Sequence, residues 1–190
     1  MFNILKELLF SRELSFEEGT ITMLKGRVVI IPIHIFVEIY KKLQEYKIDP
    51  NKFLYEIGEK EGVYWIGQIK DRYRMKPAET LKWGLNSMSV GGWGKIETVK
   101  VDLIKKDIAV FRAYNSPFAK LLGRTGKVSD PILTGFIGGG GSIIYNRSLE
   151  CQETKCIAKG DMFCEFVVRP SKKDWLSKYR SKYQLKGNEK

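Results

Sequence analysis

The sequence predicts an α+β fold, in which helices pack on one side of an antiparallel sheet within a single domain. Two observations favour this class. Three consecutive segments, 33–46, 50–73 and 77–90, place apolar residues at helical spacing. Later, 99–114 alternates apolar and polar residues about a short turn, and 148–169 contains two closing strand patterns. Helices segregated from antiparallel hairpins exclude a doubly wound parallel sheet.

The first thirty residues combine three predicted elements. Residues 2–10 are apolar and fit a helix that docks on the core or on a second copy of the chain. Apolar residues then alternate on both sides of Gly19, which predicts a hairpin. Gly26 opens a predicted buried strand over Arg27–Ile31, and Pro32 ends it.

Glycines interrupt two of the predicted helices. The helix over 50–73 contains three of them, each costing about 1 kcal/mol relative to Ala, at Gly58, Gly62 and Gly67. We therefore expect another backbone or a ligand to approach this helix closely. A later helix is predicted to begin at Asp130-Pro131, and its Gly138–Gly141 run is interpreted as close helix packing or a pocket wall.

The remaining segments set the predicted domain organisation. Residues 115–128 follow no regular pattern, so we expect an irregular loop there. Pro170 is predicted to end the fold, which assigns 1–169 to one domain, with 1–19 as a dimerisation arm. Residues 170–190 are a basic tail, which is either a short amphipathic helix or unstructured.

Composition limits the classes of partner. The 190 residues have a formal net charge of +11, which invites a nucleic-acid partner, but no recognised nucleic-acid motif accompanies the charge. Richness in Lys, Glu and Ile is typical of thermophile proteins. The longest apolar run, Val28–Val37, is too short to cross a bilayer and lacks a signal-peptide pattern. We therefore expect a cytoplasmic protein without a membrane partner.

The chemistry of the sequence concentrates near its C-terminal end. Cys151, Cys156 and Cys164 lie within fourteen residues, and an odd, clustered set argues against a disulfide framework. Cys156 and Cys164 flank a turn at 159–161, so a hairpin would bring both sulfurs to one end of the sheet. Glu153 lies three residues before Cys156, and thiolates and carboxylates both bind zinc. Spacing alone leaves open the alternative of buried thiols that bind nothing.

A tetrahedral zinc requires a fourth ligand, for which the sequence offers two candidates. Cys151 lies two residues before Glu153, so both project to the same face of a regular strand. Asp130 lies at the predicted N-terminus of a helix, where carboxylates commonly cap. A water molecule is the third option.

The closing segment resembles the signature of the 4-vinyl reductase domain family, in the string Glu153-x-x-Cys156-x-x-x-Gly160-Asp161-x-x-Cys164-Glu165-Phe166-Val167-Val168. The helical stretches Leu133–Phe136 and Tyr55–Gly62 are also similar to that family, so the resemblance covers roughly 20–169. It implies a fold like that of TRAPP vesicle-tethering subunits and haem-type nitric-oxide-associated sensor domains. It further implies a small-ligand-binding domain with an apolar pocket, which is often a homodimer.

The resemblance also implies a ligand set for the metal. In phenol-sensing relatives a zinc is held by an upstream Cys, a Glu and two further Cys, and Glu153, Cys156 and Cys164 match the last three. Asp130 falls at the upstream position, so this chain departs from the family there. The phenol-contacting His and Trp of those relatives have no counterpart.

The sequence predicts a metal-containing sensor of apolar ligands rather than an enzyme, because no catalytic set stands out. Aromatic walls with small glycine gaps are typical of apolar pockets, and the candidate lining residues are Tyr64, Trp65, Trp83 and Phe136. Two alternative functions remain in view. One is an accessory reductase component that acts on a vinyl-type substrate with electrons from a partner. The other is a basic scaffold or nucleic-acid-binding protein.

Overall fold

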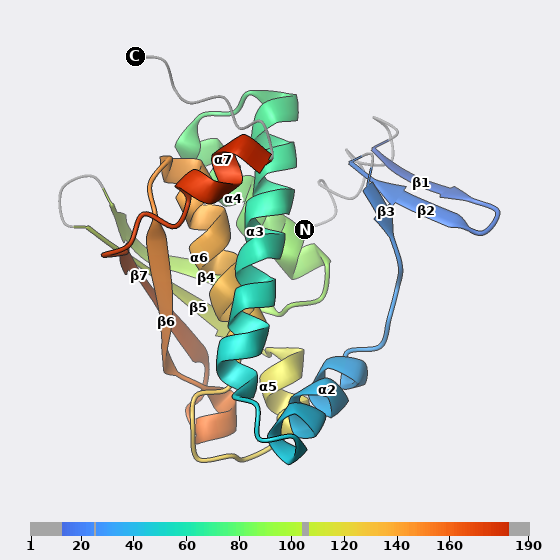
Figure 1. Cartoon of the computed structure of the whole chain (residues 1–190), viewed down its shortest axis with the longest axis vertical. Coiled ribbons are helices and arrows are strands. Elements are labelled where there is room, and N and C mark those ends of the chain that lie inside the picture. The colour runs from blue at the N-terminus through green and yellow to red at the C-terminus, as the bar shows by residue number, and fades with distance from the viewer. Residues whose placement is uncertain (1–12, 25, 104–106, 183–190) are drawn as a thin grey trace.

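The protein was examined as a computed structural model, in which residues 13–24, 26–103 and 107–182 are described (Figure 1). The predicted helix at 2–10 lies outside these residues. Along the chain the elements are β1 Leu14–Glu17, β2 Thr20–Met23, β3 Gly26–Val28, α2 His34–Glu45, α3 Pro50–Tyr73, α4 Pro77–Val90, β4 Lys95–Asp102, β5 Ile108–Tyr114, α5 Pro117–Leu122, α6 Pro131–Tyr145, β6 Leu149–Lys155, the 3₁₀ turn η1 Ile157–Lys159, β7 Cys164–Pro170 and α7 Ser177–Lys182.

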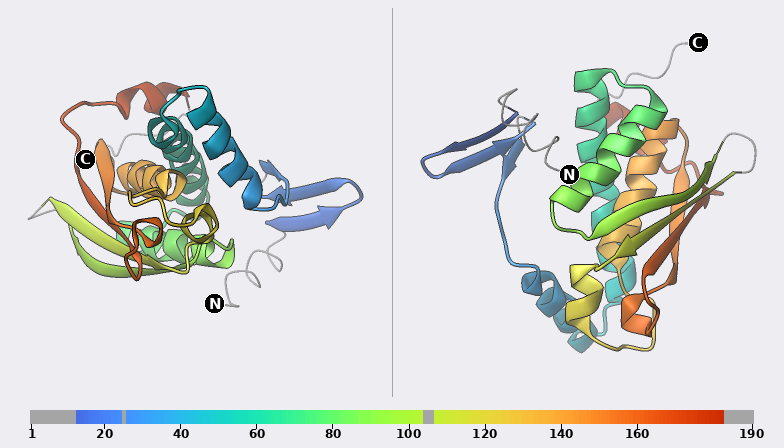
Figure 2. Two further views of the ribbon diagram at one scale, coloured as in Figure 1. Left: turned by 90° about the horizontal axis from the view of Figure 1, so that it is seen from below. Right: turned by 180° about the vertical axis from the view of Figure 1, so that it is seen from behind.

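The main sheet has four antiparallel strands in the order β4-β5-β7-β6. Alternate residues of β5, β6 and β7 are buried, as expected when one face meets the core. The helices α6 and α4 contact this face, and α3 packs on α6 from the other side (Figure 2). The predicted α+β class, with helices on one side of an antiparallel sheet, is therefore confirmed.

Glycines allow α3 and α6 to cross with their backbones in contact. A Cβ added at Gly58 would stand 2.1 Å from the carbonyl oxygen of Ile132, and one at Gly139 would stand 2.1 Å from that of Glu59. No side chain larger than hydrogen fits at such a distance. The interpretation of these glycines as sites of close backbone approach is thus correct. The crossing fixes α6, whose N-terminus and middle contribute to the site described below.

A second, three-stranded sheet, β1-β2-β3, lies apart from the main sheet and projects sideways from the helices, which it meets at one end (Figure 1). It is held by Leu24, which is 3% exposed, and by an ion pair between the buried Glu13 and Arg72 of α3. The hairpin predicted about Gly19 is confirmed. The buried strand predicted over Arg27–Ile31 is wrong, because β3 ends at Val28 and the residues that follow it are exposed.

Two further segments differ from expectation. The irregular loop predicted over 115–128 contains α5, which begins at Ser116 with a hydrogen bond from the Ala119 N–H to the Ser116 hydroxyl. The packed core also continues beyond residue 169. Leu176 and Tyr179 are buried against α3 and α6, and the indole of Trp175 donates to the Leu149 carbonyl at 3.1 Å. Among the described residues, no helix is both long and apolar enough to cross a membrane.

Candidate metal centre and ligand cavity

Three donor side chains converge where the β6–β7 hairpin turns. Glu153 is on β6, Cys156 follows that strand, and Cys164 begins β7. One donor atom from each lies within 4.8 Å of the other two, and the Sγ atoms of Cys156 and Cys164 are 3.7 Å apart. Both cysteines are fully buried and Glu153 is 7% exposed. The hairpin therefore brings together the three residues that the sequence singled out.

The turn between the strands explains this convergence. The register of β6 shifts between Glu153 and Lys155, which is a local irregularity that re-aims the side chains at the strand end. The chain then makes the turn η1 and reverses at Gly160, whose φ of +113° strongly favours glycine. The Asp161 carboxylate accepts a hydrogen bond from the Cys156 N–H at 2.8 Å, which closes the loop upon itself.

The segment that precedes α6 completes the surroundings of the cluster. Asp130 is fully buried, and its main-chain N–H donates to Glu153 Oε2 at 2.8 Å. The hydroxyl of Ser116 donates to Asp130 Oδ2 at 2.5 Å, and the Ser129 N–H points at Cys156 Sγ at 3.4 Å. Sequence reasoning missed Ser116, because its contact with Asp130 depends on how α5 packs and leaves no local pattern.

Two carboxylate oxygens in this cluster have no hydrogen-bond partner among the described residues: Asp130 Oδ1 and Glu153 Oε1. Both are buried, and leaving a buried acceptor unsatisfied costs about 1–3 kcal/mol, more for a charged group. Burial raises the pKa of Asp130 to about 7, although the hydrogen bond from Ser116 opposes the shift. Burial, with Asp130 and Cys156 nearby, raises the pKa of Glu153 to about 10. A divalent cation would satisfy both oxygens and stabilise their ionised forms.

The thiols are also electrostatically coupled. Cys164 donates its S–H to Cys156, and this hydrogen bond lowers the pKa of Cys156 and raises that of Cys164. A thiol beside a thiolate, with two carboxyl groups next to them, is a set of sulfur and oxygen donors that suits zinc. The residues present therefore fit a zinc ion.

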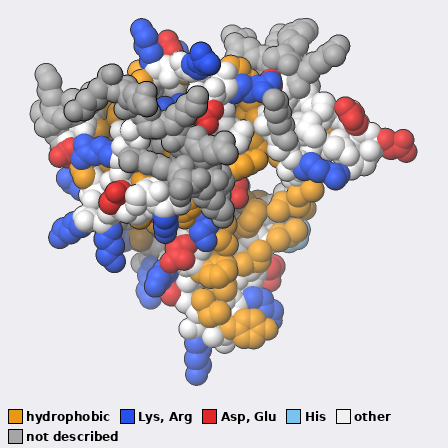
Figure 3. All heavy atoms as spheres, turned by 45° about the horizontal axis from the view of Figure 1, so that its top comes forward, with side chains coloured by type: hydrophobic (Ala, Val, Ile, Leu, Met, Phe, Trp, Pro, Cys, Tyr) orange, Lys and Arg blue, Asp and Glu red, His pale blue; other side chains and the backbone are white. Residues whose placement is uncertain are grey.

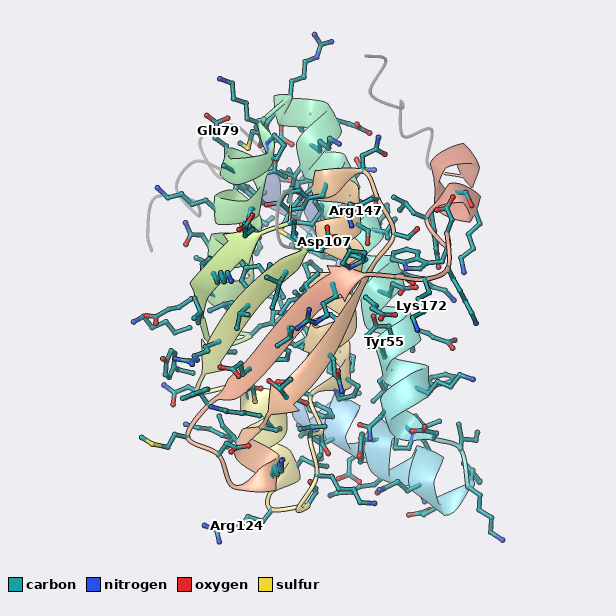
Figure 4. All side chains as sticks on the ribbon, turned by 90° about the vertical axis from the view of Figure 1, so that its left-hand side faces the viewer. Tyr55, Glu79, Asp107, Arg124, Arg147 and Lys172 are labelled. Atoms are coloured by element: carbon teal, nitrogen blue, oxygen red, sulfur yellow. The ribbon has the colours of Figure 1, made fainter. Side chains whose placement is uncertain are left out.

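Cys151 does not join this cluster. Its burial alternates in step with Glu153, as predicted, but a Cβ at Gly138 would stand 3.3 Å from the Cys151 Cβ, so its side chain packs against α6. Tyr55 reaches from α3 toward β6, where its hydroxyl accepts a hydrogen bond from the Cys151 N–H at 3.3 Å (Figure 4). Of the two candidate fourth ligands, only Asp130 contacts the cluster, and it does so through its main-chain N–H; its carboxylate is not among the donor atoms that lie within 4.8 Å of one another.

A cavity of about 240 Å³ lies between the small sheet and the helices. We call it the outer cavity. Three of the four aromatic residues proposed as lining, Trp65, Trp83 and Phe136, border it. The fourth, Tyr64, instead packs edge-on against Trp65, with ring centroids 5.3 Å apart. The small sheet contributes further lining through Leu14, Met23 and Leu24.

Sequence reasoning missed most of the α4 wall of the outer cavity. That wall is formed by Ser87, Met88, Val90 and Gly91, besides Trp83. The signal was present, because Trp83, Ser87 and Val90 recur at intervals of four and three and therefore share one helical face. Leu24 could not be assigned in this way, since it follows β2 and meets the helices only through tertiary packing.

No protein-family model matches the sequence, and no curated protein matches it as a relative. Solved structures do share its fold. The phenol-responsive sensory domain of the transcription activator PoxR, solved with phenol, superposes with a TM-score of 0.77 at 16% identity, covering 98% of both chains. A vinyl-4-reductase family protein from Methanocaldococcus jannaschii gives a TM-score of 0.54 at 18% identity, over 78% of this chain and 86% of that one.

A trafficking protein particle complex subunit 3 from Naegleria fowleri, covalently bound to palmitic acid, gives a TM-score of 0.48 at 15% identity, over 74% of this chain and 95% of that one. The chain thus has the fold of the PoxR sensory domain and of the vinyl-4-reductase family protein, as the resemblance implied.

Proposed function

We propose that this protein is a sensor domain that binds a small, neutral, apolar molecule in the outer cavity and holds a structural zinc ion at the β6–β7 turn. The observation that carries the proposal is the lining of that cavity, which among the described residues contains three tryptophans and no charged side chain. Few polar groups among many apolar ones are typical of small-molecule sites. The shared fold with a phenol-responsive sensory domain supports the same function.

Zinc would be held by Glu153, Cys156 and Cys164, with Asp130 as the fourth ligand. The donor atoms that lie within 4.8 Å of one another belong to Glu153, Cys156 and Cys164, and the unpartnered Oδ1 of Asp130 favours that residue over Cys151 as the fourth ligand. A shell of four protein ligands leaves no open position, so the ion would stabilise structure rather than act on a substrate. Free thiolates of this kind persist in the reducing cytoplasm, which is where we place the protein.

The metal centre and the cavity are joined by α6. Asp130 immediately precedes this helix and Phe136 lies within it, about 9 Å further along the axis at 1.5 Å per residue. Zinc would therefore anchor the helix that forms one wall of the cavity. A ligand in the cavity would in turn alter the position of α6 and so of the β6–β7 turn, because α6 is packed backbone to backbone against α3.

We further propose that the protein forms a homodimer through an exposed apolar surface on the linker after β3, on α2 and at the start of α3. Figure 3 shows hydrophobic side chains gathered along this part of the molecule. They are Val29, Ile30, Ile31, Ile35, Ile39, Tyr46, Ile48, Phe53 and Ile57, and they are between 38% and 80% exposed. An exposed apolar patch of this kind is typical of a surface that contacts another protein.

The dimer is tested by measuring the mass of the full-length protein by light scattering. A dimer is expected for the wild type and a monomer for the double substitution Ile35→Glu, Ile39→Glu. A monomeric wild type at high micromolar concentration would reject the interface.

Ligand binding is tested with toluene, by calorimetry or by quenching of tryptophan fluorescence. Ser87 lines the outer cavity, so Ser87→Phe would fill much of it, whereas its neighbour Asn86 is exposed on the same helix. We expect the wild type and the matched control Asn86→Phe to bind toluene and Ser87→Phe to lose at least tenfold in affinity. Equal affinity in all three proteins, or no binding by the wild type, would contradict the proposal.

A further inference from the structure

A second, smaller cavity lies directly behind the outer one. It measures about 30 Å³ and is bordered by α4, α6 and the inner face of the main sheet, with Leu81, Phe111 and Val168 in its walls. We call it the inner cavity. Met88 and Phe136 line both cavities, so these two side chains form the partition between them.

The inner cavity exists because glycines, which have no side chain, form part of its walls. Gly84, Gly140 and Gly141 all line it, and a Cβ added at Gly84 would stand 2.9 Å from Ile66 Cδ1. A Cβ at Gly140 would meet Ile66 Cγ1 at 2.8 Å. Neither of these two glycines has a positive φ. Glycine is therefore required at these two positions because a larger side chain would collide with Ile66, and not because the backbone is left-handed there.

The partition is suited to opening. Met88 is 6% exposed and belongs to an unbranched residue type with three rotatable bonds, which adapts to irregular gaps. Phe136 is only partly buried, and it packs against both hydrophobic clusters that meet there. A rotamer change of Met88 would therefore be the simplest movement that joins the two cavities.

The lining restricts the chemistry of an occupant. Within 13–24, 26–103 and 107–182, no charged side chain borders either cavity, and the polar groups in the walls include the hydroxyls of Ser87 and Tyr145. The Ser87 hydroxyl already donates to the Gly84 carbonyl at 2.8 Å. Burial raises the pKa of Tyr145, which keeps that hydroxyl neutral. An ionised ligand would lose its hydration here without compensation.

We propose that the ligand is an elongated neutral molecule, with a single ring in the outer cavity and an unbranched alkyl chain that passes between Met88 and Phe136 into the inner cavity. This inference rests on the proposed function and adds the shape of the ligand. A dry apolar cavity of about 150 Å³ is known to hold benzene, so 240 Å³ accepts one substituted ring. The inner 30 Å³ is about twice what one water-sized group requires, so it takes roughly two methylene groups.

The test measures dissociation constants of the purified full-length protein for toluene, ethylbenzene, n-propylbenzene and n-butylbenzene by titration calorimetry. Burial of one methylene contributes about 0.8 kcal/mol, which is roughly a three- to fourfold gain in affinity. We expect this gain at each of the first two steps, to n-propylbenzene, and little or none at the third. A constant affinity across the series would overturn the inference.

A variant that fills only the inner cavity separates this inference from the proposed function. Gly84 lines the inner cavity and not the outer one, so Gly84→Val should leave toluene affinity within twofold of wild type and abolish the gain with chain length. Leu85→Phe fills the same cavity and serves if the valine variant unfolds early on heating. If both variants keep the full gain, the chain does not enter the inner cavity. If wild type binds toluene without a chain-length gain, only this inference fails; if it binds none of the four, the proposed function fails as well.

Discussion

Gly139→Ala is expected to be among the most damaging single-methyl substitutions in the protein. The added Cβ would stand 2.1 Å from the carbonyl oxygen of Glu59, and an ordinary contact requires about 3.4 Å, so α3 and α6 must separate by about 1.3 Å. That separation also opens the contacts at Gly58 and Gly135, which belong to the same crossing. Overpacking of a core costs about 1–3 kcal/mol, and loss of the shared interface adds to it, so we expect about 3 kcal/mol or more.

Gly141→Ala is the matched control, two residues further along the same helix. Its Cβ would stand 3.4 Å from Leu149 Cδ1, which is a tolerable contact. Alanine is favoured over glycine in a helix by about 1 kcal/mol, so this variant should be neutral or slightly stabilised. The free energy of unfolding is measured by urea denaturation followed by tryptophan fluorescence. A difference below about 1 kcal/mol between the two variants would refute the description of the crossing.

Three further predictions concern the buried charges. In zinc-free protein the raised pKa values of Asp130, about 7, and Glu153, about 10, favour folding while both groups are protonated, so their contribution to stability should fall as pH rises from about 4 toward 10, whereas the lowered pKa of Cys156 contributes in the opposite sense. Urea melts of the wild type and of Asp130→Asn isolate the Asp130 contribution: the stability of the wild type relative to that variant should fall by up to about 4 kcal/mol between pH 4 and pH 7, and zinc should reverse the trend; a constant difference over this range without metal would contradict the burial of Asp130. Asp130→Asn should stabilise the zinc-free protein at pH 8 yet weaken zinc binding at least tenfold in a chelator competition, and unchanged zinc affinity would remove Asp130 from the site. Arg72→Met should leave the buried Glu13 unpaired and destabilise the protein by about 3 kcal/mol, whereas Arg72→Met with Glu13→Gln should recover part of that loss; no recovery in the double variant would show that the ion pair is not the cause.

The sequence was sufficient to predict an element wherever the residues that define it are neighbours in the chain. The boundaries of α3 followed from the Asp49 cap, whose carboxylate accepts hydrogen bonds from the Asn51 and Lys52 N–H groups, and from the proline at position 50. The turn that gathers Cys156 and Cys164 was predictable because strand patterns flank a glycine. These features depend on neighbours in sequence, which a single chain displays directly.

Features that depend on distant partners were not predictable. The run after β3 is rich in Val and Ile, as buried strands are, but no strand lies beside it, and Val29 and Ile30 are 77% and 80% exposed. The helix α5 has only six residues, too few to establish a helical period. The contact of Asp130 with Glu153 joins residues far apart in the sequence, so only the family resemblance, and no local pattern, pointed to it. The outer cavity likewise exists only once the small sheet has docked on the helices.

The metal content of the purified protein and its cysteine variants shows directly whether Cys156 and Cys164 bind zinc at the β6–β7 turn. Native mass spectrometry of protein produced in zinc-supplemented medium should give one zinc per chain for the wild type. Cys151→Ser, which alters a buried cysteine outside the cluster, should retain that zinc, whereas Cys156→Ser and Cys164→Ser should lose it. A wild-type protein without zinc, or stoichiometric zinc in both Cys156→Ser and Cys164→Ser, would contradict the account.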